Sequence, residues 1–256
     1  MSPSPIHRPP TRPHRWWGWL LACQLGVAFV CWRFGWRVGL PLMALSHLPF
    51  WWGALWPYSR FYGPVLNRLP GAAPRVWLTI DDGPSDDTLP MLDLLDAHGA
   101  KATFFLVARR AAARPECVSE IVRRGHDIGN HSDSHPARWF WALGPRAMRR
   151  EIAEAQATLT RLAGRAPRWF RAVVGMANPF VQAPLREHGL ARVAWSARGF
   201  DGLGRDVETV MAKLAPGVRT GAIVLLHEGG DGRHIEILRR VLALLGERGL
   251  RAELPE

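Results

Sequence analysis

The chain has 256 residues, of which 48% are hydrophobic, and its formal net charge is +11. This length allows one sizeable domain, or one domain with an appendage, and the hydrophobic content excludes a wholly disordered chain. The charge is uneven, because residues 1–80 contain eight Arg and no Asp or Glu, whereas residues 81–256 contain 25 basic and 22 acidic residues. Since the later part is almost balanced, the basic composition does not predict a nucleic-acid-binding domain. The three Cys form no disulfide framework, which is typical of a reducing compartment.

The N-terminal segment has the composition of a membrane anchor. Residues 1–15 are rich in Pro, Arg and His and are predicted to be disordered. Residues 16–57 then contain two uncharged runs, 16–32 and 38–56, each close to the ~20 residues that a membrane-spanning helix needs. Eight of the 13 Trp lie here, mostly at the ends of the runs, as in an aromatic belt. We predict a membrane anchor over 16–57 and a linker over 58–74. The anchor is a helical hairpin, or else a single span or a re-entrant second segment.

The charges around the two runs predict a topology. A cleaved signal peptide would need a small-residue cleavage site and no second apolar run, so the second run argues against it. Two spans place both ends of the chain on the same side of the membrane. Six Arg flank the hairpin and two lie in its turn, so the positive-inside rule puts the following domain on the cytoplasmic face of a bacterial inner membrane. A single span would put that domain outside.

From residue 75 onward, strand-like and helix-like segments alternate. We expect strands at 75–80, 101–107, 126–129, 168–170, 191–195, 222–226 and 251–254, and helices at 88–98, 115–124, 145–162 and 235–245, with further helical runs between the later strands. This alternation predicts a parallel sheet with crossover helices, either a barrel or a doubly wound sheet. In both architectures the functional loops follow the carboxyl ends of the strands. The candidate residues at these positions are Asp81, Asp82, His131, His135, Arg171, Asp201 and His227.

Two short motifs carry residues that suit metal chemistry. Asp81 and Asp82 end the first strand and precede Gly83-Pro84, which is also a good turn sequence. His131 and His135 are four residues apart, so on a helical turn both imidazoles would face the same way. Imidazole and carboxylate ligands suit Zn²⁺, or Co²⁺ or Ni²⁺ in the same geometry. Because the two adjacent carboxylates point in different directions, one can bind a metal while the other stays free.

The two motifs resemble the first and second motifs of the polysaccharide deacetylase (NodB-homology) family, also called carbohydrate esterase family 4. The usual forms in that family are Thr-Phe-Asp-Asp-Gly-Pro and His-Ser/Thr-x-x-His. The third motif of the family, Arg-x-Pro-x-Gly, is matched by Arg171 and Gly175, with Val173 in place of the Pro. This departure keeps the charged group and alters the loop beside it.

The fourth and fifth motifs follow in the order of the family. Asp201 matches the Asp of the fourth motif, and Gly202 replaces the Trp that usually comes next. His227 ends the Leu-His pair of the fifth motif. The resemblance covers residues 76–254 and none of the hairpin. It implies a distorted (β/α)7-type barrel over residues 75–256, in agreement with the alternation of strands and helices.

The resemblance also implies a role for each residue. The implied metal ligands are Asp82, His131 and His135, and the metal, most simply Zn²⁺, would make a bound water acidic. Asp81 would act as the catalytic base and would be held by Arg171. His227 would act as the general acid and would be tuned by Asp201. The implied activity is hydrolysis of an N-acyl group, usually N-acetyl, on a glucosamine unit.

A membrane-tethered member of this family would act on a membrane-linked or envelope glycan, with an N-acylated amino-sugar glycan or glycolipid as substrate and membrane lipid as a partner. One alternative is deformylation or deacetylation of an undecaprenyl-linked amino sugar, since the family includes such enzymes. Another is a non-catalytic glycan-binding membrane protein with a decayed site, since two motifs are altered. Trp139 and Trp141 are candidates to line the sugar site, or else are core or membrane-contact aromatics.

Overall fold

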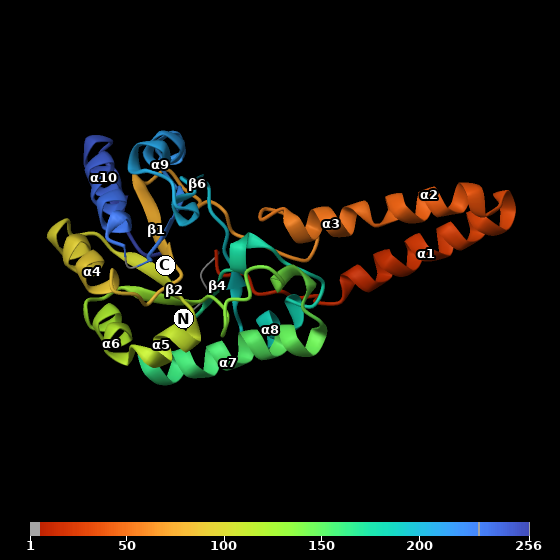
Figure 1. Cartoon of the computed structure of the whole chain (residues 1–256), viewed down its shortest axis with the longest axis horizontal. Helices are drawn as coiled ribbons and strands as arrows, with labels where there is room; N and C mark the ends of the chain where they lie inside the picture. Colours follow the sequence, from red (N-terminus) through yellow and green to blue (C-terminus); the bar gives the residue numbers. More distant parts are fainter. Residues whose placement is uncertain (1–5, 230, 256) are drawn as a thin grey trace.

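The computed structural model describes residues 6–229 and 231–255, and Figure 1 shows an α/β domain from which a helical hairpin projects. The strands lie in the order β5-β4-β3-β2-β1-β7-β6, with β8 beside β1. They are β1 (Arg75–Asp81), β2 (Ala102–Leu106), β3 (Asp127–Asn130), β4 (Trp169–Phe170), β5 (Ala191–Arg192), β6 (Ala197–Arg198), β7 (Ile223–His227) and β8 (Arg251–Ala252). Every pairing between these strands is parallel, as the alternation predicted.

Helices connect the strands and cover the outside of the sheet. They are α4 (Thr88–Ala97), α5 (Ala108–Ala113), α6 (Pro115–Arg123), α7 (Pro145–Ala163), α8 (Gln182–Glu187), α9 (Val207–Leu214) and α10 (Arg233–Glu247), with short 3₁₀ helices η1 (Phe140–Ala142), η2 (Val173–Gly175), η3 (Asp201–Leu203) and η4 (Ala215–Gly217). The four helices predicted with bounds are α4, α6, α7 and α10. The strand expected at 191–195 is wrong in length: only its first two residues pair as β5, and a separate β6 follows.

The alternation of side chains along β1 separates the core from the site. Leu78, like its even-numbered neighbours in the strand, packs outward against the helices. Trp77 points to the other face, into an inner cluster that includes Trp169. Since side chains in a strand alternate with a period of two, Thr79 and Asp81 also lie on the inner face. Thr79 and Asp81 thus carry polar groups inward toward the carboxyl end of β1.

The sheet is a half-barrel of parallel strands, in partial agreement with the distorted (β/α)7-type barrel that the resemblance implied, and its ladder ends at β5 and β6. These edge strands are only two residues long, which is too short to complete a ladder between them. Residues 64–69 cross the opening: Leu66 pairs with Val193 beyond β5, and Arg68 pairs with Ala222 before β7. Val65 and Leu69 are buried in the inner cluster. Part of the predicted 58–74 linker is therefore packed into the domain.

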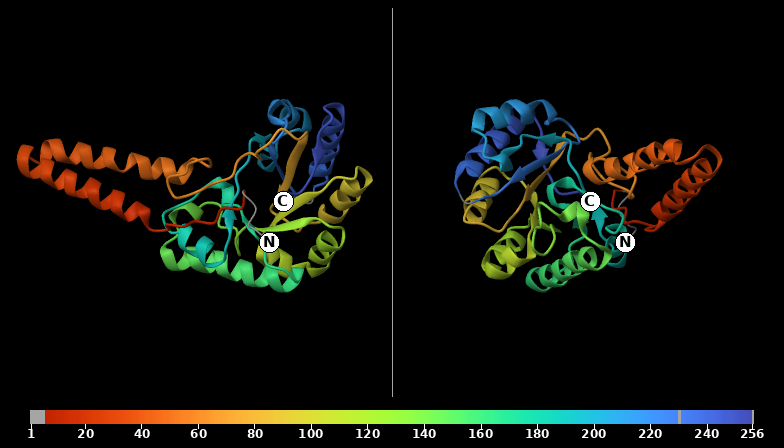
Figure 2. Two further views of the ribbon diagram at one scale, coloured as in Figure 1. Left: turned by 180° about the vertical axis from the view of Figure 1, so that it is seen from behind. Right: turned by 45° about the vertical axis from the view of Figure 1, so that its right-hand side comes forward.

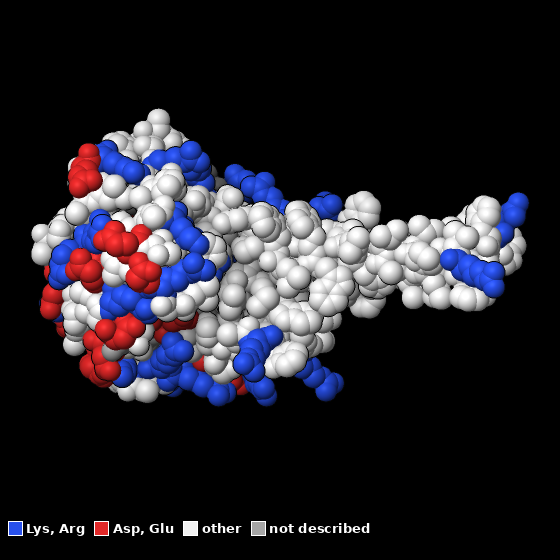
Figure 3. Space-filling view, turned by 45° about the horizontal axis from the view of Figure 1, so that its top comes forward, with Lys and Arg blue, Asp and Glu red and all other residues white. Residues whose placement is uncertain are grey.

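The hairpin has two antiparallel arms, α1 (Arg15–Phe34) and then α2 (Trp36–Ser46) followed by α3 (Leu48–Leu55), as Figures 1 and 2 show. Gly35 makes the turn with a φ of 84°, in the region that favours glycine. Each arm has 20 residues and is apolar enough to cross a membrane. A helix of this length spans about 30 Å, which equals the hydrocarbon thickness of a bilayer. In Figure 3 the shaft of the hairpin is uncharged and basic residues lie at its tip, where the sequence has Arg33 and Arg37.

The base of the hairpin contacts the loops that follow β3 and β4. Trp51 of α3 lies against Trp141, with ring centroids 5.4 Å apart. The Ala177 backbone N–H donates to the Ala54 carbonyl at 2.9 Å. Since these loops lie at the carboxyl ends of the strands, the hairpin is attached on the side of the domain where the predicted site residues gather.

Residues 6–14, which were predicted to be disordered, run along the domain. Ile6 packs against the inner cluster. His7 Nε2 lies 3.1 Å from the Arg168 carbonyl, and its ring makes an edge contact with Trp169. The part of the same prediction that concerns residues 1–5 lies outside the described residues.

Candidate active site

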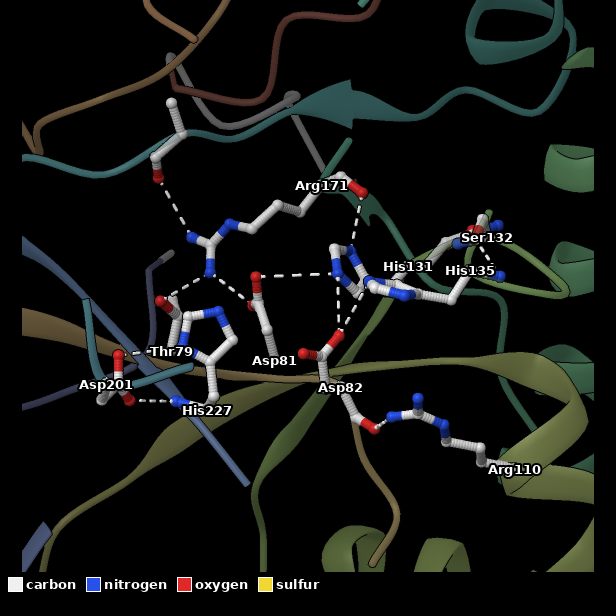
Figure 4. Close-up of polar contacts among 12 residues, drawn as sticks. Thr79, Asp81, Asp82, Arg110, His131, Ser132, His135, Arg171, Asp201 and His227 are labelled. Carbon is white, nitrogen blue, oxygen red and sulfur yellow. Dashed lines mark hydrogen bonds and ion pairs between the residues drawn. The ribbon is translucent and has the colours of Figure 1, made fainter. Parts of the chain in front are cut away.

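All seven residues predicted for the site meet at the carboxyl ends of the strands, as Figure 4 shows. Asp81 is the last residue of β1, and Asp82 follows it with a φ of 74°. This left-handed conformation turns the second carboxylate away from the direction of the first. The other five come from the loop after β3 (His131, His135), the residue after β4 (Arg171), η3 (Asp201) and the end of β7 (His227).

Asp82, His131 and His135 form a compact group of candidate ligands. Asp82 Oδ1 lies 3.4 Å from His131 Nε2 and 2.9 Å from His135 Nε2. One ligand atom from each residue lies within 4.8 Å of the other two. Three donor atoms converging from two loops can hold one cation and leave its remaining positions open.

The loop after β3 does not contain the helical turn that the spacing of the two His predicted. Ser132 has a φ of 72° and His135 a φ of 55°, in the left-handed region that non-glycine residues rarely adopt. Glu151 of α7 fixes the loop by accepting from the backbone N–H groups of Asp133 at 3.2 Å and Ser134 at 2.9 Å. Strained backbone held in place by specific bonds is common at functional sites. The imidazoles therefore converge through this loop geometry and not through helical periodicity.

The chemistry of the three donor atoms fits a divalent metal. His131 Nδ1 lies 2.9 Å from the Arg171 carbonyl, which can only accept, so Nδ1 carries the proton and Nε2 presents a lone pair. Burial raises the pKa of Asp82, but hydrogen bonds and charge from His131 and His135 in their protonated forms lower it more, to far below its usual range. A cation that replaced those Nε2 protons would likewise keep the carboxylate ionised. An ionised carboxylate and imidazole lone pairs are ligands that Zn²⁺ takes in proteins.

Asp81 is held apart from this group by a buried arginine. Its Oδ1 accepts a hydrogen bond from Arg171 Nη1 at 2.7 Å. The same guanidinium donates to Thr79 Oγ1 at 2.8 Å and to the Ala194 carbonyl at 3.0 Å. Asp81 Oδ2 lies 3.8 Å from His131 Nε2. One oxygen of Asp81 is therefore anchored, while the other faces the candidate metal position.

Asp201 and His227 form a second charged pair. Asp201 Oδ1 lies 2.9 Å from His227 Nδ1, and Oδ2 accepts from the His227 backbone N–H at 2.7 Å. Burial lowers the pKa of His227, but the hydrogen bond and charge of Asp201, together with the charges of Asp81 and Asp82, raise it to about 9. The imidazole is therefore protonated at neutral pH and can donate a proton from Nε2. The site thus combines a carboxylate that can accept a proton with an imidazolium that can donate one.

Comparisons with known proteins agree with this geometry. The family model for polysaccharide deacetylase matches residues 69–193. The chitooligosaccharide deacetylase of Sinorhizobium fredii is 35% identical over 170 residues, which make up 66% of this chain and 78% of that protein. The chain belongs to the polysaccharide deacetylase family.

Solved structures of the family share this fold. The crystal structure of the Bc1960 peptidoglycan N-acetylglucosamine deacetylase superposes with a TM-score of 0.68 at 30% identity, covering 73% of this chain and 88% of that one. A mutant of a family 4 carbohydrate esterase pseudoenzyme, with restored enzymatic activity, superposes with a TM-score of 0.66 at 25% identity, covering 73% and 68%. The family thus contains a pseudoenzyme, so membership alone does not establish catalysis.

The two departures from the family motifs have local structural reasons. Val173, in place of Pro, is fully buried in a cluster of apolar side chains, so it fills space without a polar role. Gly175 of the same motif has a φ of 75°, and a Cβ there would lie 2.5 Å from the Trp195 ring. A Cβ at Gly202 would lie 3.3 Å from the His227 ring. Gly202, which stands where the family has Trp, therefore packs closely against the His227 ring without a side chain of its own.

Several residues that support the site were not predicted from the sequence. Thr79 could have been found, because its position two residues before Asp81 puts it on the same face of β1. Glu151 had no signal, because it comes from α7, far from the loop that it holds. Glu228 is 3% exposed and accepts from Ser85 N–H at 3.1 Å. Burial, only partly offset by such hydrogen bonds, raises its pKa to about 7.

The two tryptophans after the metal motif differ in their surroundings. Trp141 contacts Trp51 of the hairpin, which supports the membrane-contact alternative for this residue. Trp139 is 64% exposed. In the described part of the chain, neither tryptophan makes a polar contact with the seven site residues. Trp141 Nε1 donates to the Arg138 carbonyl at 3.1 Å.

Proposed function

We propose that this protein is a metal-dependent carbohydrate N-deacetylase that removes an N-acyl group, most simply N-acetyl, from an amino sugar in a membrane-linked or envelope glycan. The observation that carries the proposal is the convergence of Asp82, His131 and His135. These candidate ligands lie between Asp81, which is hydrogen-bonded to Arg171, and His227, which is hydrogen-bonded to Asp201. The names of the relatives, which are deacetylases of chitooligosaccharide and of peptidoglycan N-acetylglucosamine, support the same class of substrate.

In this proposal the metal ligands are Asp82, His131 and His135. A bound divalent metal, Zn²⁺ or else Co²⁺ or Ni²⁺, supplies Lewis acidity that polarises the acyl carbonyl and lets water lose a proton near neutral pH. The Arg171 carbonyl fixes the His131 tautomer that such binding needs. Glu151, through the backbone of Asp133 and Ser134, keeps the loop in the conformation that presents both imidazoles.

Asp81 acts as the general base. Its Oδ1 stays bonded to Arg171, so only Oδ2 is free to take a proton from the attacking water. Thr79 and the Ala194 carbonyl hold the guanidinium in place, so Arg171 is a positioning residue.

His227 acts as the general acid on the leaving amine. Its Nδ1–H donates a hydrogen bond to Asp201. The Nε2 proton is therefore the one that His227 delivers to the nitrogen of the breaking C–N bond. After the transfer the C–N bond is broken, the acyl group leaves as a carboxylate and the sugar carries an amine. Asp201 is a positioning residue that keeps the acid protonated at neutral pH.

The hairpin is proposed to anchor the domain in a bacterial inner membrane, with residues 16–57 as the anchor and residues 75–256 as the deacetylase domain. The two apolar arms and the tryptophans near their ends support this organisation. With both arms inserted, the excess of Arg outside the turn favours a cytoplasmic position of the domain.

The proposal is tested by measuring release of free amine from a panel of N-acyl amino sugars by the purified full chain with Zn²⁺. The panel comprises N-acetyl and N-formyl forms of a free, a polymeric and a lipid-linked amino sugar. Release from at least one member, lost in Asp81→Asn, is the expected result. Stoichiometric metal binding without release from any member would instead indicate the non-catalytic glycan-binding protein.

A further inference from the structure

A second group of candidate metal ligands lies outside the catalytic site. Asp87, Asp231 and His234 each offer one ligand atom within 4.8 Å of the other two. Asp87 is the N-cap residue of α4, Asp231 lies in the loop after β7, and His234 lies in the first turn of α10. The two helices are neighbours on the outside of the sheet (Figures 1 and 2). The group therefore joins the segment that follows β1 to the segment that follows β7.

His234 is buried without the hydrogen bonds that an imidazole needs. It is only 6% exposed, and within the described part of the chain neither of its ring nitrogens has a hydrogen-bond partner. Gly229 packs so closely against the ring that a Cβ there would lie 2.8 Å from Cε1 of His234. The position of the ring is thus fixed. Since a buried polar group without a partner lowers stability, a ligand bound to this ring would offset that cost.

The distances within the group are those between ligands of one ion. His234 Nδ1 lies 3.2 Å from Asp231 Oδ1 and 3.7 Å from Asp87 Oδ2. The 3.2 Å contact lacks the geometry of a hydrogen bond. Two ligands of a tetrahedral ion, each 2.0–2.1 Å from it, lie about 3.3 Å apart and point at the ion rather than at each other. The candidate ligands of the catalytic site have a similar spacing, with Asp82 Oδ1 3.4 Å from His131 Nε2.

The two carboxylates complete the group from opposite sides. Asp87 is 3% exposed, and its two oxygens accept from the backbone N–H groups of Gly232 at 3.2 Å and Gly229 at 3.4 Å. Each carboxylate oxygen has two lone pairs, so a hydrogen bond to the backbone does not prevent it from binding a cation as well. The side chain of Asp231 is 53% exposed. The group thus has two buried ligands and one at the surface, where an ion can enter.

We propose that Asp87, Asp231 and His234 form a second, structural site for a divalent transition metal, separate from the catalytic site. One imidazole and two carboxylates suit Zn²⁺, Co²⁺ or Ni²⁺, whereas Ca²⁺ and Mg²⁺ take oxygen ligands. The metal holds the loop after β7 against the start of α4, and Glu228 makes the same connection through its hydrogen bonds with Ser85. Because one of its ligands is exposed, this site binds metal more weakly than the catalytic site.

The test measures Zn²⁺ binding in variants that lack one site or both. The full chain in detergent micelles is stripped of metal with a chelator, and bound Zn²⁺ per chain is then measured by equilibrium dialysis. His135→Ala disables the catalytic site and leaves the second site alone. Asp231→Ala and, separately, His234→Ala are added to that variant. Asp206→Ala is the matched control, because Asp206 and Asp231 are both exposed and both accept from a backbone N–H two or three residues later. Circular dichroism checks that each variant is folded and gives its Tm.

The expected result is two Zn²⁺ per wild-type chain, one in His135→Ala with or without Asp206→Ala, and none when Asp231→Ala is added to His135→Ala. In His135→Ala, Zn²⁺ at a hundredfold excess over its Kd should raise the Tm by about 5–10 °C, and Ca²⁺ should not.

Absence of Zn²⁺ binding in His135→Ala would overturn the inference. Binding in that variant that persists with both Asp231→Ala and His234→Ala would also overturn it. One Zn²⁺ in both the wild type and His135→Ala, lost with Asp231→Ala, would support the second site and contradict the catalytic metal site of the proposed function.

Discussion

Asp201 binds His227 twice, with Oδ1 2.9 Å from Nδ1 of the ring and Oδ2 2.7 Å from the backbone nitrogen. One carboxylate therefore fixes both the position of the imidazole and the tautomer that it would have when neutral. This relationship gives the site its most direct pH dependence, because the pKa of His227 is raised to about 9.

We expect kcat to fall as the pH rises through about 9 in the wild-type chain. The general acid works in its protonated form, which is present below its pKa and is lost above it. In Asp201→Asn the charge that raises the pKa of His227 is removed, so the falling limb should move to lower pH and the maximal rate should decrease. A pH–rate profile of both chains with saturating Zn²⁺ checks this. If the falling limb stayed at the same pH in Asp201→Asn, it would not be caused by deprotonation of His227.

Asp81→Asn should retain metal and lose turnover. The amide keeps the size of the side chain but cannot take a proton, and loss of a general base costs about 100- to 10,000-fold in rate. Metal content is measured by mass spectrometry on the same sample that is assayed. Arg171→Lys serves as the companion variant, because it keeps a positive charge but cannot contact Asp81, Thr79 and the Ala194 carbonyl together. If Asp81→Asn kept the wild-type rate, Asp81 would not be the general base.

Gly175→Ala should destabilise the fold more than Gly189→Ala. Both glycines have a positive φ, 75° and 63°, so an added Cβ costs about 1–2 kcal/mol at either position. Only at Gly175 would the Cβ also meet the Trp195 ring, at 2.5 Å, whereas nothing lies within 4 Å at Gly189. Overpacking adds about 1–3 kcal/mol. The difference is measured as urea denaturation midpoints of the two variants and the wild type. Equal midpoints for the two variants would show that the Trp195 ring moves to accommodate the extra methyl group.

The chain should be found in the membrane fraction and resist extraction with alkaline carbonate, because two apolar arms of 20 residues each match the bilayer. A fluorescent reporter that folds only in the cytoplasm should be active when fused after Glu256. A reporter that is active only outside the membrane should be inactive at the same position. The reverse pattern would indicate one span and an external domain.

Much of the fold could be predicted because β-strand and helix patterns are local. After Arg75, the strand β1 is buried and its polar side chains, Thr79 and Asp81, lie toward its carboxyl end. The helix α7 shows its apolar stripe in the sequence. Loops that follow parallel strands meet at the carboxyl ends of the strands, and this rule was enough to predict that Asp81, Arg171 and His227 lie together. The contacts in the structure confirm that these residues converge, while their roles remain proposals.

The remaining features depend on interactions that have no local pattern. The two-residue strand β5 pairs with the equally short β4, and β6 pairs with the longer β7, so neither strand has a local pattern from which its bounds could be predicted. The conformation of Ser132 and His135 is stabilised by Glu151, which is distant in the sequence. Residues 6–14 look disordered by composition, and the contacts of Ile6 and His7 with the domain have no local pattern in the sequence.

The central claim is tested most directly by preparing the full chain without metal, by chelation and dialysis, and assaying amine release before and after adding one equivalent of Zn²⁺. We predict no release from the metal-free protein, restored release with Zn²⁺, and no restoration in His135→Ala, which lacks one ligand of the candidate site. Full activity in the metal-free protein, or equal restoration in His135→Ala, would contradict the assignment of Asp82, His131 and His135 as the metal site.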